Sequence, residues 1–287
     1  MAADLGNLAL PVRSYGIHEL AHGRGFRVED CVCCLGARSP VATREHPRTA
    51  IAVMLAGTFA TRASQGTALL VPGAMLIKNA ATSHEYRHVD EGGDISVIFE
   101  YDDELLDEVH ASFARVRRGR PMFAALAIPG SAQTAHATAL AAQAFASRDP
   151  AVFEDAALAV AAAAAAVDWS ARTARGDATG SQLARVSRAV RYVDAHFADD
   201  CGLETLAAIA DFSPFHFARV FRAVTGQTPR QHVIARRLDA AASALRTTHT
   251  PILEVALDAG FGDLSHFTTS FRRAFGASPG RYRARHR

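Results

Sequence analysis

The sequence of 287 residues has little of several features that define whole classes of protein. It has four cysteines, Cys31, Cys33 and Cys34 in a cluster and Cys201 alone, which excludes a disulfide framework and predicts reduced thiols. The longest uncharged apolar run, residues 156–167, is shorter than the roughly 20 residues that span a bilayer. No basic segment followed by an apolar stretch opens the chain, so we expect no signal peptide, no membrane contact and a cytoplasmic location.

Charge is distributed unevenly along the chain. The net charge is +2, but residues 181–287 contain fifteen Arg against nine Asp or Glu, a net of +6, which leaves −4 for residues 1–180. A basic surplus confined to the C-terminal third is expected of a segment that binds a polyanion such as nucleic acid. Hydrophobic residues make up 49% of the chain, enough for packed cores, and the length suits two domains.

The chain divides into stretches of different character. Short β-type runs separated by Gly, Pro and Asn turns predict a small antiparallel barrel or sandwich; they lie at 27–35, 49–60, 68–71, 74–77 and 94–101. Ala- and Leu-rich segments with helical spacing follow at 102–116, 132–147 and 151–173. The predicted domains are a β domain over 1–101, a helical segment over 102–175, a linker over 176–182 and a helical domain over 183–287.

An internal repeat at a fixed offset of fifty residues is the strongest signal in the sequence. The matched pairs are His216 and His266, Phe217 and Phe267, Phe221 and Phe271, Arg222 and Arg272, Gly226 and Gly276, and Pro229 and Pro279. A short helical pattern and a tight turn precede each copy, so the sequence predicts two helix-turn-helix units, over 203–226 and 252–276. Residues 230–245 form a continuous helical pattern that would join the units at a fixed distance.

The second helix of each unit has recognisable ends and an apolar face. Ser213 and Asp263 are predicted N-caps, and Gly226 and Gly276 are predicted to end the helices. Side chains at helical spacing are expected to pack inward; they are Phe217, Val220, Phe221 and Val224 in the first copy and Phe267, Ser270, Phe271 and Ala274 in the second.

The segments SPFHFARVFRAVTGQTP and GFGDLSHFTTSFRRAFGASPGRYR closely resemble the signature of AraC/XylS-type transcription regulators, and the resemblance extends over residues 183–287. It implies that a linker helix joins two recognition helices, 214–225 and 264–275, which enter successive major-groove segments of double-stranded promoter DNA. It also implies activation of transcription through contact with RNA polymerase, a homodimer formed through residues 103–173, and a sensor domain for an unknown small-molecule effector.

The free faces of these two helices are expected to contact DNA. Arg219 can donate two hydrogen bonds to a guanine edge, and Phe215 or a Thr methyl group can contact a thymine methyl group. The predicted base-facing residues are Phe215, His216, Ala218, Arg219, Leu264, Ser265, Thr268 and Thr269, and the predicted phosphate contacts are Arg222, Arg272 and Arg273. Because Thr268 and Thr269 stand where many relatives have Arg, we expect weaker base discrimination by the second unit.

The strand-rich stretch resembles the cupin-like β-barrel that precedes the DNA-binding part in many family members, with Pro72-Gly73, residues 74–79 and His84 similar to the second half of a cupin motif. The expected fold is therefore multidomain α+β, with a cupin-like barrel, appended helices and an all-α domain of two helix-turn-helix units. A barrel of this kind encloses a ligand-sized interior. Candidate effector-binding residues are His46, His84, Tyr86 and His88.

Three interpretations of these polar residues remain open: an organic effector, a metal or redox signal that also uses Glu85 and the clustered thiols, or core cysteines with histidines on a rim. Cys31 and Cys33 share one face of a strand and Cys34 points to the other, which disfavours joint chelation. The alternative function is thus a metal- or thiol-redox-responsive repressor with the same DNA-binding domain.

Catalytic signatures are weak. The sequence lacks a tight HxH pair with a following Glu at cupin spacing, and the HExxH pattern at 84–88 lies between strand-like runs although zinc proteases need it on a helix. A nucleophile elbow and a phosphate-binding Gly loop are also missing. We therefore expect no enzymatic activity, no resident metal and no cofactor, and a cupin-type metalloenzyme is a remote alternative.

Overall fold

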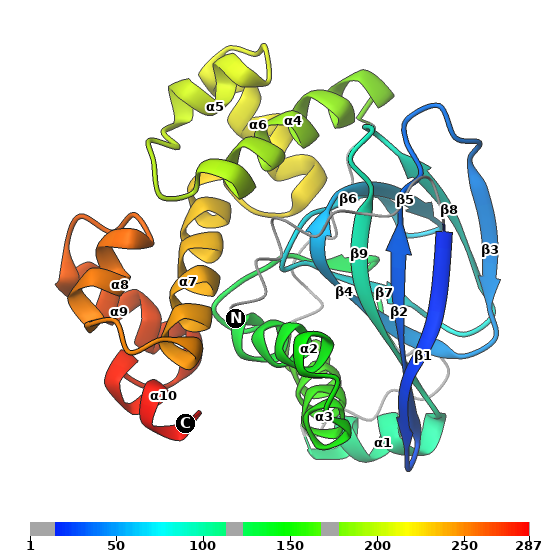
Figure 1. Cartoon of the computed structure of the whole chain (residues 1–287). Coiled ribbons are helices and arrows are strands. Elements are labelled where there is room, and N and C mark those ends of the chain that lie inside the picture. Colours follow the sequence, from blue (N-terminus) through cyan, green and yellow to red (C-terminus); the bar gives the residue numbers. More distant parts are fainter. Residues whose placement is uncertain (1–14, 113–122, 168–177, 287) are drawn as a thin grey trace.

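A computed structural model describes residues 15–112, 123–167 and 178–286. In the described N-terminal part the strands are β1 (Tyr15–Gly23), β2 (Phe26–Cys33), β3 (Ala42–His46), β4 (Thr49–Gly57), β5 (Phe59–Ala63), β6 (Gly66–Leu70), β7 (Met75–Lys78), β8 (Thr82–His88), β9 (Asp94–Tyr101) and β10 (Ala127–Ile128). They form a six-stranded sheet of order β1-β2-β9-β4-β7-β10 and a four-stranded sheet of order β3-β8-β5-β6, all pairs antiparallel (Figure 1). The predicted antiparallel β structure is confirmed.

The six-stranded sheet is covered on both faces, which explains why β4 is apolar at nearly every position. Ile51 and Val53 pack against helices α2 (Ala135–Ser147) and α3 (Pro150–Ala166), whereas the alternate residues Ala50 and Ala52 face the four-stranded sheet. Helix α1 (Asp103–Ser112) completes the described helices of this half. The small side chains on the second face leave space between the two sheets.

Four strands were not expected from the sequence: β1, β3, β8 and the two-residue β10. The predicted strands at 27–35, 49–60, 68–71, 74–77 and 94–101 correspond to β2, β4 with the start of β5, β6, β7 and β9. Parts of three predicted segments lie outside the described residues: the ends of two predicted helices, 113–116 and 168–173, and the first two residues of the predicted linker. Within the described residues, every helix is too short or too polar to cross a membrane.

The C-terminal part is helical from α4 (Gly180–His196) to α10 (Pro279–Arg285). Between them lie α5 (Leu203–Ile209), α6 (Pro214–Thr225), α7 (Pro229–Thr247), α8 (Ile252–Asp258) and α9 (Leu264–Phe275). The helical helix-turn-helix domain expected from the sequence is confirmed: α5 with α6 and α8 with α9 form the two units, and α7 joins them (Figure 1).

Local chemistry explains where the second helix of each unit starts and stops. Gly226 and Gly276 end α6 and α9 in the left-handed region, with φ of 76° and 69°. The Asp263 carboxylate accepts a hydrogen bond from the Ser265 backbone N–H at 2.8 Å, whereas the Ser213 side chain makes no such bond. Seven of the eight predicted inward residues are buried, and Ser270 is half-buried.

Arg237 of α7 connects the two units. Its guanidinium donates hydrogen bonds to the backbone carbonyls of Phe197 at 2.7 Å and Asp199 at 2.9 Å, beside the first unit, and to that of Gly260 at 2.7 Å, in the turn of the second. Charge-assisted bonds to three carbonyls hold the α4–α5 connection and the turn of the second unit to one helix.

The β-rich half contacts both helix-turn-helix units. Strand β6 packs on α6, and one apolar cluster extends from Leu69 of the sheet into Val190 of α4 and Val220 of α6. Helix α2 packs on α7 and α9, where Ala139 joins the core around Phe271. The two halves are therefore docked in this conformation.

Candidate DNA-binding surface and ligand pocket

The face of α6 opposite its buried stripe is exposed. Phe215 is 81% exposed, and Arg219 and Arg222 are also exposed. Phe215 is the most exposed large hydrophobic side chain among the described residues. The two arginines lie one turn apart and, by their spacing, share a side of the helix.

The equivalent face of α9 is more polar and less uniform. Leu264 is partly exposed, Ser265 and Thr269 are exposed, and Thr268 is half-buried. Arg272 and Arg273 in the last turn are exposed. Helix α9 carries hydroxyl groups and, in its last turn, two arginines, and its central positions have hydroxyl groups where α6 has Arg219.

The repeated histidines have packing contacts of their own. His216 lies against Phe212, with ring centroids 4.9 Å apart, and His266 lies against Phe261 at 5.7 Å. The Arg185 guanidinium lies over the Phe212 ring, 3.7 Å from its centroid. His216 and Ala218, both predicted to face bases, are half-buried, whereas His266 is exposed, so contact with the preceding turn accounts for the histidine more fully in the first copy than in the second.

A cavity of about 330 Å³ lies between the two sheets. Ala50 and Ala52 form part of its wall, and residues from both sheets contribute its polar groups: Glu29, Cys31, Cys33, Arg44, Glu45, His46, Lys78, Tyr86, His88, Asp94, Ser96 and Glu100. Its size falls in the range of small-molecule sites. Cys31 and Cys33, two residues apart in β2, line it, as expected from side-chain alternation along a strand, whereas Cys34, which follows the strand, does not.

Burial sets the protonation of the polar groups around this cavity. Burial lowers the pKa of Lys78, the single lysine of the chain, to about 8, and lowers that of His46 to about 3. It also raises the pKa of Cys31 to about 12, which keeps this thiol protonated. The neutral His46 ring pairs with Tyr86 through Nε2 and the phenol oxygen, 2.7 Å apart.

Of the four predicted effector-binding residues, the structure places three at the cavity: His46, Tyr86 and His88. His84 is fully buried behind them, 5.5 Å from the His46 ring, and its Nε2 lies 3.1 Å from the Thr82 hydroxyl. Its pKa is lowered to about 4 by burial.

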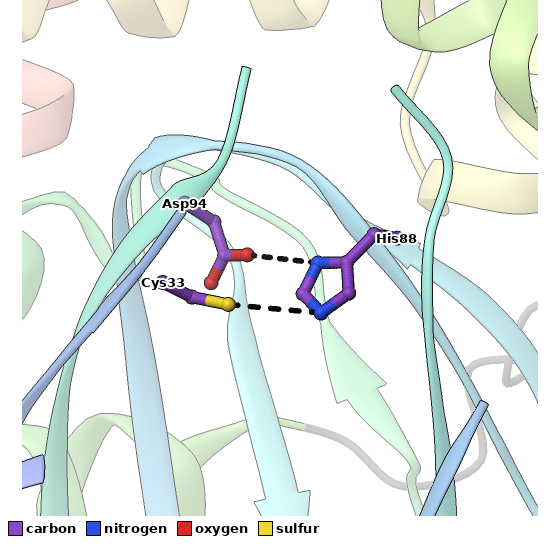
Figure 2. Close-up of side chains that lie close together, drawn as sticks. All are labelled: Cys33, His88 and Asp94. Carbon is purple, nitrogen blue, oxygen red and sulfur yellow. Dashed lines mark hydrogen bonds and ion pairs between the residues drawn. The ribbon is translucent and has the colours of Figure 1, made fainter. Parts of the chain in front are cut away.

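At one end of the cavity, Cys33, His88 and Asp94 lie together (Figure 2). The Cys33 Sγ is 3.6 Å from His88 Nε2, and Asp94 Oδ2 is 3.5 Å from His88 Nδ1. The contacts with Asp94 and Cys33 raise the pKa of His88 to about 10. Cys33 and Asp94 are cross-strand neighbours in β2 and β9, and His88 reaches them from the end of β8 in the other sheet.

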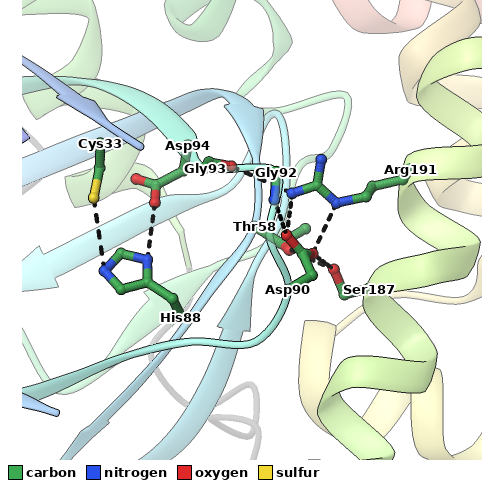
Figure 3. Close-up of polar contacts among 9 residues, drawn as sticks. All are labelled: Cys33, Thr58, His88, Asp90, Gly92, Gly93, Asp94, Ser187 and Arg191. Carbon is green, nitrogen blue, oxygen red and sulfur yellow. Dashed lines mark hydrogen bonds and ion pairs between the residues drawn. The ribbon is translucent and has the colours of Figure 1, made fainter. Parts of the chain in front are cut away.

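The turn between β8 and β9 also reaches the helical domain (Figure 3). We call Thr58, Asp90, Ser187 and Arg191 the Asp90 cluster. Asp90 accepts hydrogen bonds from Thr58 at 3.0 Å, from Ser187, and from Arg191 Nε at 2.8 Å and Nη2. These bonds lower the pKa of Asp90 against the effect of burial. Ser187 and Arg191 belong to α4, so the cluster joins the two halves.

Sequence reasoning missed Lys78, Asp94 and the Asp90 cluster. Lys78 could have been noticed, because it is a charged residue at the end of the apolar run Met75–Lys78. A lysine in that position either marks the end of the strand or is buried with it, and a buried lysine is rare enough to indicate a site. Asp90 and Arg191 are 101 residues apart and carry no local signature of their pairing.

The comparisons with known proteins concern the C-terminal third. A family model described as a helix-turn-helix domain matches residues 206–285. The regulatory protein SoxS of Salmonella typhimurium is 35% identical over 96 residues, which are 33% of this chain and 90% of that protein. The right origin-binding protein of Escherichia coli is 37% identical over 92 residues, 32% of this chain and 32% of its own length, so this match spans about a third of that protein.

Among solved structures, the DNA-binding domain of AdpA in complex with a target DNA is 35% identical, with a TM-score of 0.34, and the match covers 36% of this chain and 93% of that one. The matched relatives are regulatory and DNA-binding proteins rather than enzymes. With its repeated helix-turn-helix units and this similarity to SoxS over nearly the whole of that protein, the chain belongs to the AraC/XylS family of DNA-binding transcription regulators.

Proposed function

We propose that this regulator is an effector-responsive activator that binds promoter DNA through α6 and α9. The observation that carries the proposal is that α6 and α9, the corresponding helices of the two copies of the repeat, each have a buried apolar stripe and an exposed opposite face. Arg237 of α7 binds the α4–α5 connection beside the first unit and the turn of the second, so the two exposed faces have a defined relation to one another. Two helices so linked suit two successive major-groove segments.

The proposed contacts follow from exposure. In α6, Phe215 and Arg219 contact bases and Arg222 contacts a phosphate, with His216 and Ala218 beside them. In α9 the proposed base-facing residues are Leu264, Ser265, Thr268 and Thr269, and the phosphate contacts are Arg272 and Arg273. The hydroxyl-rich face of α9 supports weaker discrimination by the second unit.

The proposed effector site is the cavity between the two cupin-like sheets. Its volume suits a small organic molecule, and His46, Tyr86 and His88 offer polar contacts at its wall. Strands β8 and β9, which line the cavity, are joined by the turn that carries Asp90. An effector that moves this turn would change the contact between the cavity and α4.

Activation and dimerisation complete the proposal. A homodimer would form through α1 to α3, where Leu158 of α3 is 43% exposed among small side chains that permit close helix approach. Contact with RNA polymerase is proposed from family membership, as is action in the cytoplasm. The redox- or metal-responsive repressor keeps the same DNA-binding surface and differs in the ligand of the cavity.

The experiment is selection of bound sites from random duplex DNA by the full-length protein at fixed salt, with Arg219→Ala and Arg24→Ala in parallel. Arg24 is exposed in the β1–β2 turn and gives the same loss of charge away from the proposed surface. We expect two short elements about one helical turn apart, with preference at one position lost in Arg219→Ala alone. No enrichment, or identical sites for all three proteins, contradicts the proposed base contacts.

A further inference from the structure

We propose that Cys33, His88 and Asp94 form a binding site for a divalent transition metal ion of the zinc class, and that the turn between β8 and β9 transmits its occupancy to α4. The second part rests on the proposed function of the β-rich half as a sensor. The first part rests on geometry alone. Among the described residues, this is the one group of three Cys, His or acidic side chains placed to share an ion.

The donor atoms are close enough to bind one ion. A sulfur, a ring nitrogen and a carboxylate oxygen all lie within 4.8 Å of one another. The Cys33 sulfur lies 3.6 Å from Nε2 of His88 and the Asp94 oxygen 3.5 Å from Nδ1 of the same ring, so binding through one ring nitrogen requires a small shift of the other ligand toward that side. Bond lengths of about 2.0–2.3 Å place such ligands roughly 3.3–3.7 Å apart. Figure 2 shows the three side chains directed at one another.

The surroundings favour an ion over a simple ion pair. Cys33 is 3% and Asp94 4% exposed, and the contact between His88 Nδ1 and Asp94 Oδ2, 3.5 Å long, is an ion pair without hydrogen-bond geometry. A long contact of this kind leaves both buried atoms poorly compensated, and a shared cation would satisfy both. A thiol with an imidazole selects a zinc-class ion over magnesium or calcium, which prefer oxygen ligands.

The site has three protein ligands and faces the cavity, because all three residues line it. Three ligands with a further position open is the arrangement of metal sites that bind an exogenous molecule, whereas closed sites have four. The remaining position would accept a water molecule or a donor atom of the effector. The metal would thereby select effectors that carry an oxygen, nitrogen or sulfur donor.

The ligands lie at the two ends of the turn that contacts α4. His88 ends β8, Asp94 begins β9, and Asp90 between them binds Arg191 and Ser187 (Figure 3). The Gly93 carbonyl also accepts a bond from Arg191 at 3.4 Å. An ion that holds both ends of this turn fixes the position of Asp90, and so favours one docking of α4 on the β-rich half.

The test begins with metal binding by the full-length protein without DNA. Equilibrium dialysis with Zn²⁺ should give one ion per chain, and Co²⁺ should give a sulfur-to-cobalt charge-transfer band. Cys33→Ala and Asp94→Asn should each weaken binding at least about tenfold, whereas Cys31→Ala, on the same face of β2 and in the same cavity, should not. Cobalt bound without the band in the unsubstituted protein, or full affinity in Cys33→Ala, overturns the site.

The coupling is tested with the selected DNA. Zn²⁺ should change DNA affinity by about tenfold, and Asp90→Ala should abolish this change while the metal stoichiometry stays at one. Affinity that does not respond to Zn²⁺ in the unsubstituted protein overturns the coupling. Site selection is also carried out in chelator, so its result does not depend on the metal. DNA binding without metal binding refutes this inference and leaves the proposed function standing. Metal binding without site selection refutes the proposed function and leaves the metal site standing.

Discussion

Removing either partner of the Asp90–Arg191 pair should loosen the docking of the helical domain. Asp90 accepts bonds from three side chains and from the Gly92 backbone N–H at 2.9 Å, and its side chain is 17% exposed against 33% for Arg191. Exposed ion pairs contribute about 0–1 kcal/mol, and removing one partner of a fully buried pair costs about 3–5 kcal/mol. The intermediate burial places the cost of Asp90→Ala or Arg191→Ala at about 2–3 kcal/mol.

A double-mutant cycle isolates the pair itself. Urea unfolding of the unsubstituted protein, both single variants and the double variant should give a coupling energy of about 1.5–2 kcal/mol. The apolar contacts of Val190 and Val220 remain in all four proteins, so the denaturant slope should change little. A coupling energy below about 0.5 kcal/mol would show that the pair is screened by water and does not hold α4 to the β-rich half.

Three further predictions concern the helical domain. Arg219→Ala should lose about 1–3 kcal/mol of binding to one preferred base pair, whereas Arg222→Ala should weaken binding to all sequences and reduce the salt slope by about one charge; equal slopes would argue against the phosphate contact. Phe217→Ala should cost about 3–5 kcal/mol of stability in urea, whereas Phe215→Ala should leave stability nearly unchanged and weaken DNA binding; comparable losses of stability would contradict the assigned faces. Burial lowers the pKa of His232 to about 3, so the stability it contributes is complete above pH 6.5 and falls by about 1.4 kcal/mol per pH unit below it. His232→Gln should flatten that fall between pH 6.5 and 5, and parallel stability curves for the two proteins would refute the assignment.

The helical domain was accessible from sequence because its determinants are local. Gly226 and Gly276 stop helices wherever they occur in this register, and the apolar stripes follow helical spacing. His216 shows the limit of that reasoning. A residue at the start of a helix can face a ligand or the preceding turn, and only the position of Phe212 places this ring against the turn.

Strand β8 was missed because its inward face is not aliphatic. His84, Tyr86 and His88 alternate with Ser83, Glu85 and Arg87, so hydrophobic periodicity does not distinguish the two faces. The inward residues line the cavity or lie behind it. The polar side chains that make the cavity a candidate site are therefore the ones that prevented prediction of the strand. Strand β3 is exposed along nearly its whole length and lacks an apolar face as well.

The long-range contacts restrict how a signal can reach the DNA. Helix α7 has 19 residues and is therefore about 28 Å long at 1.5 Å per residue, and Arg237 fixes the α4–α5 connection and the turn of the second unit to it. Bending α7 would break these bonds, so an effector is not expected to alter the spacing of α6 and α9. The β-rich half instead contacts the first unit through β6 and the Asp90 cluster, and the second through α2. Since the cavity residues His88 and Asp94 flank Asp90 in the chain, the first of these contacts is the one that a ligand in the cavity can change directly.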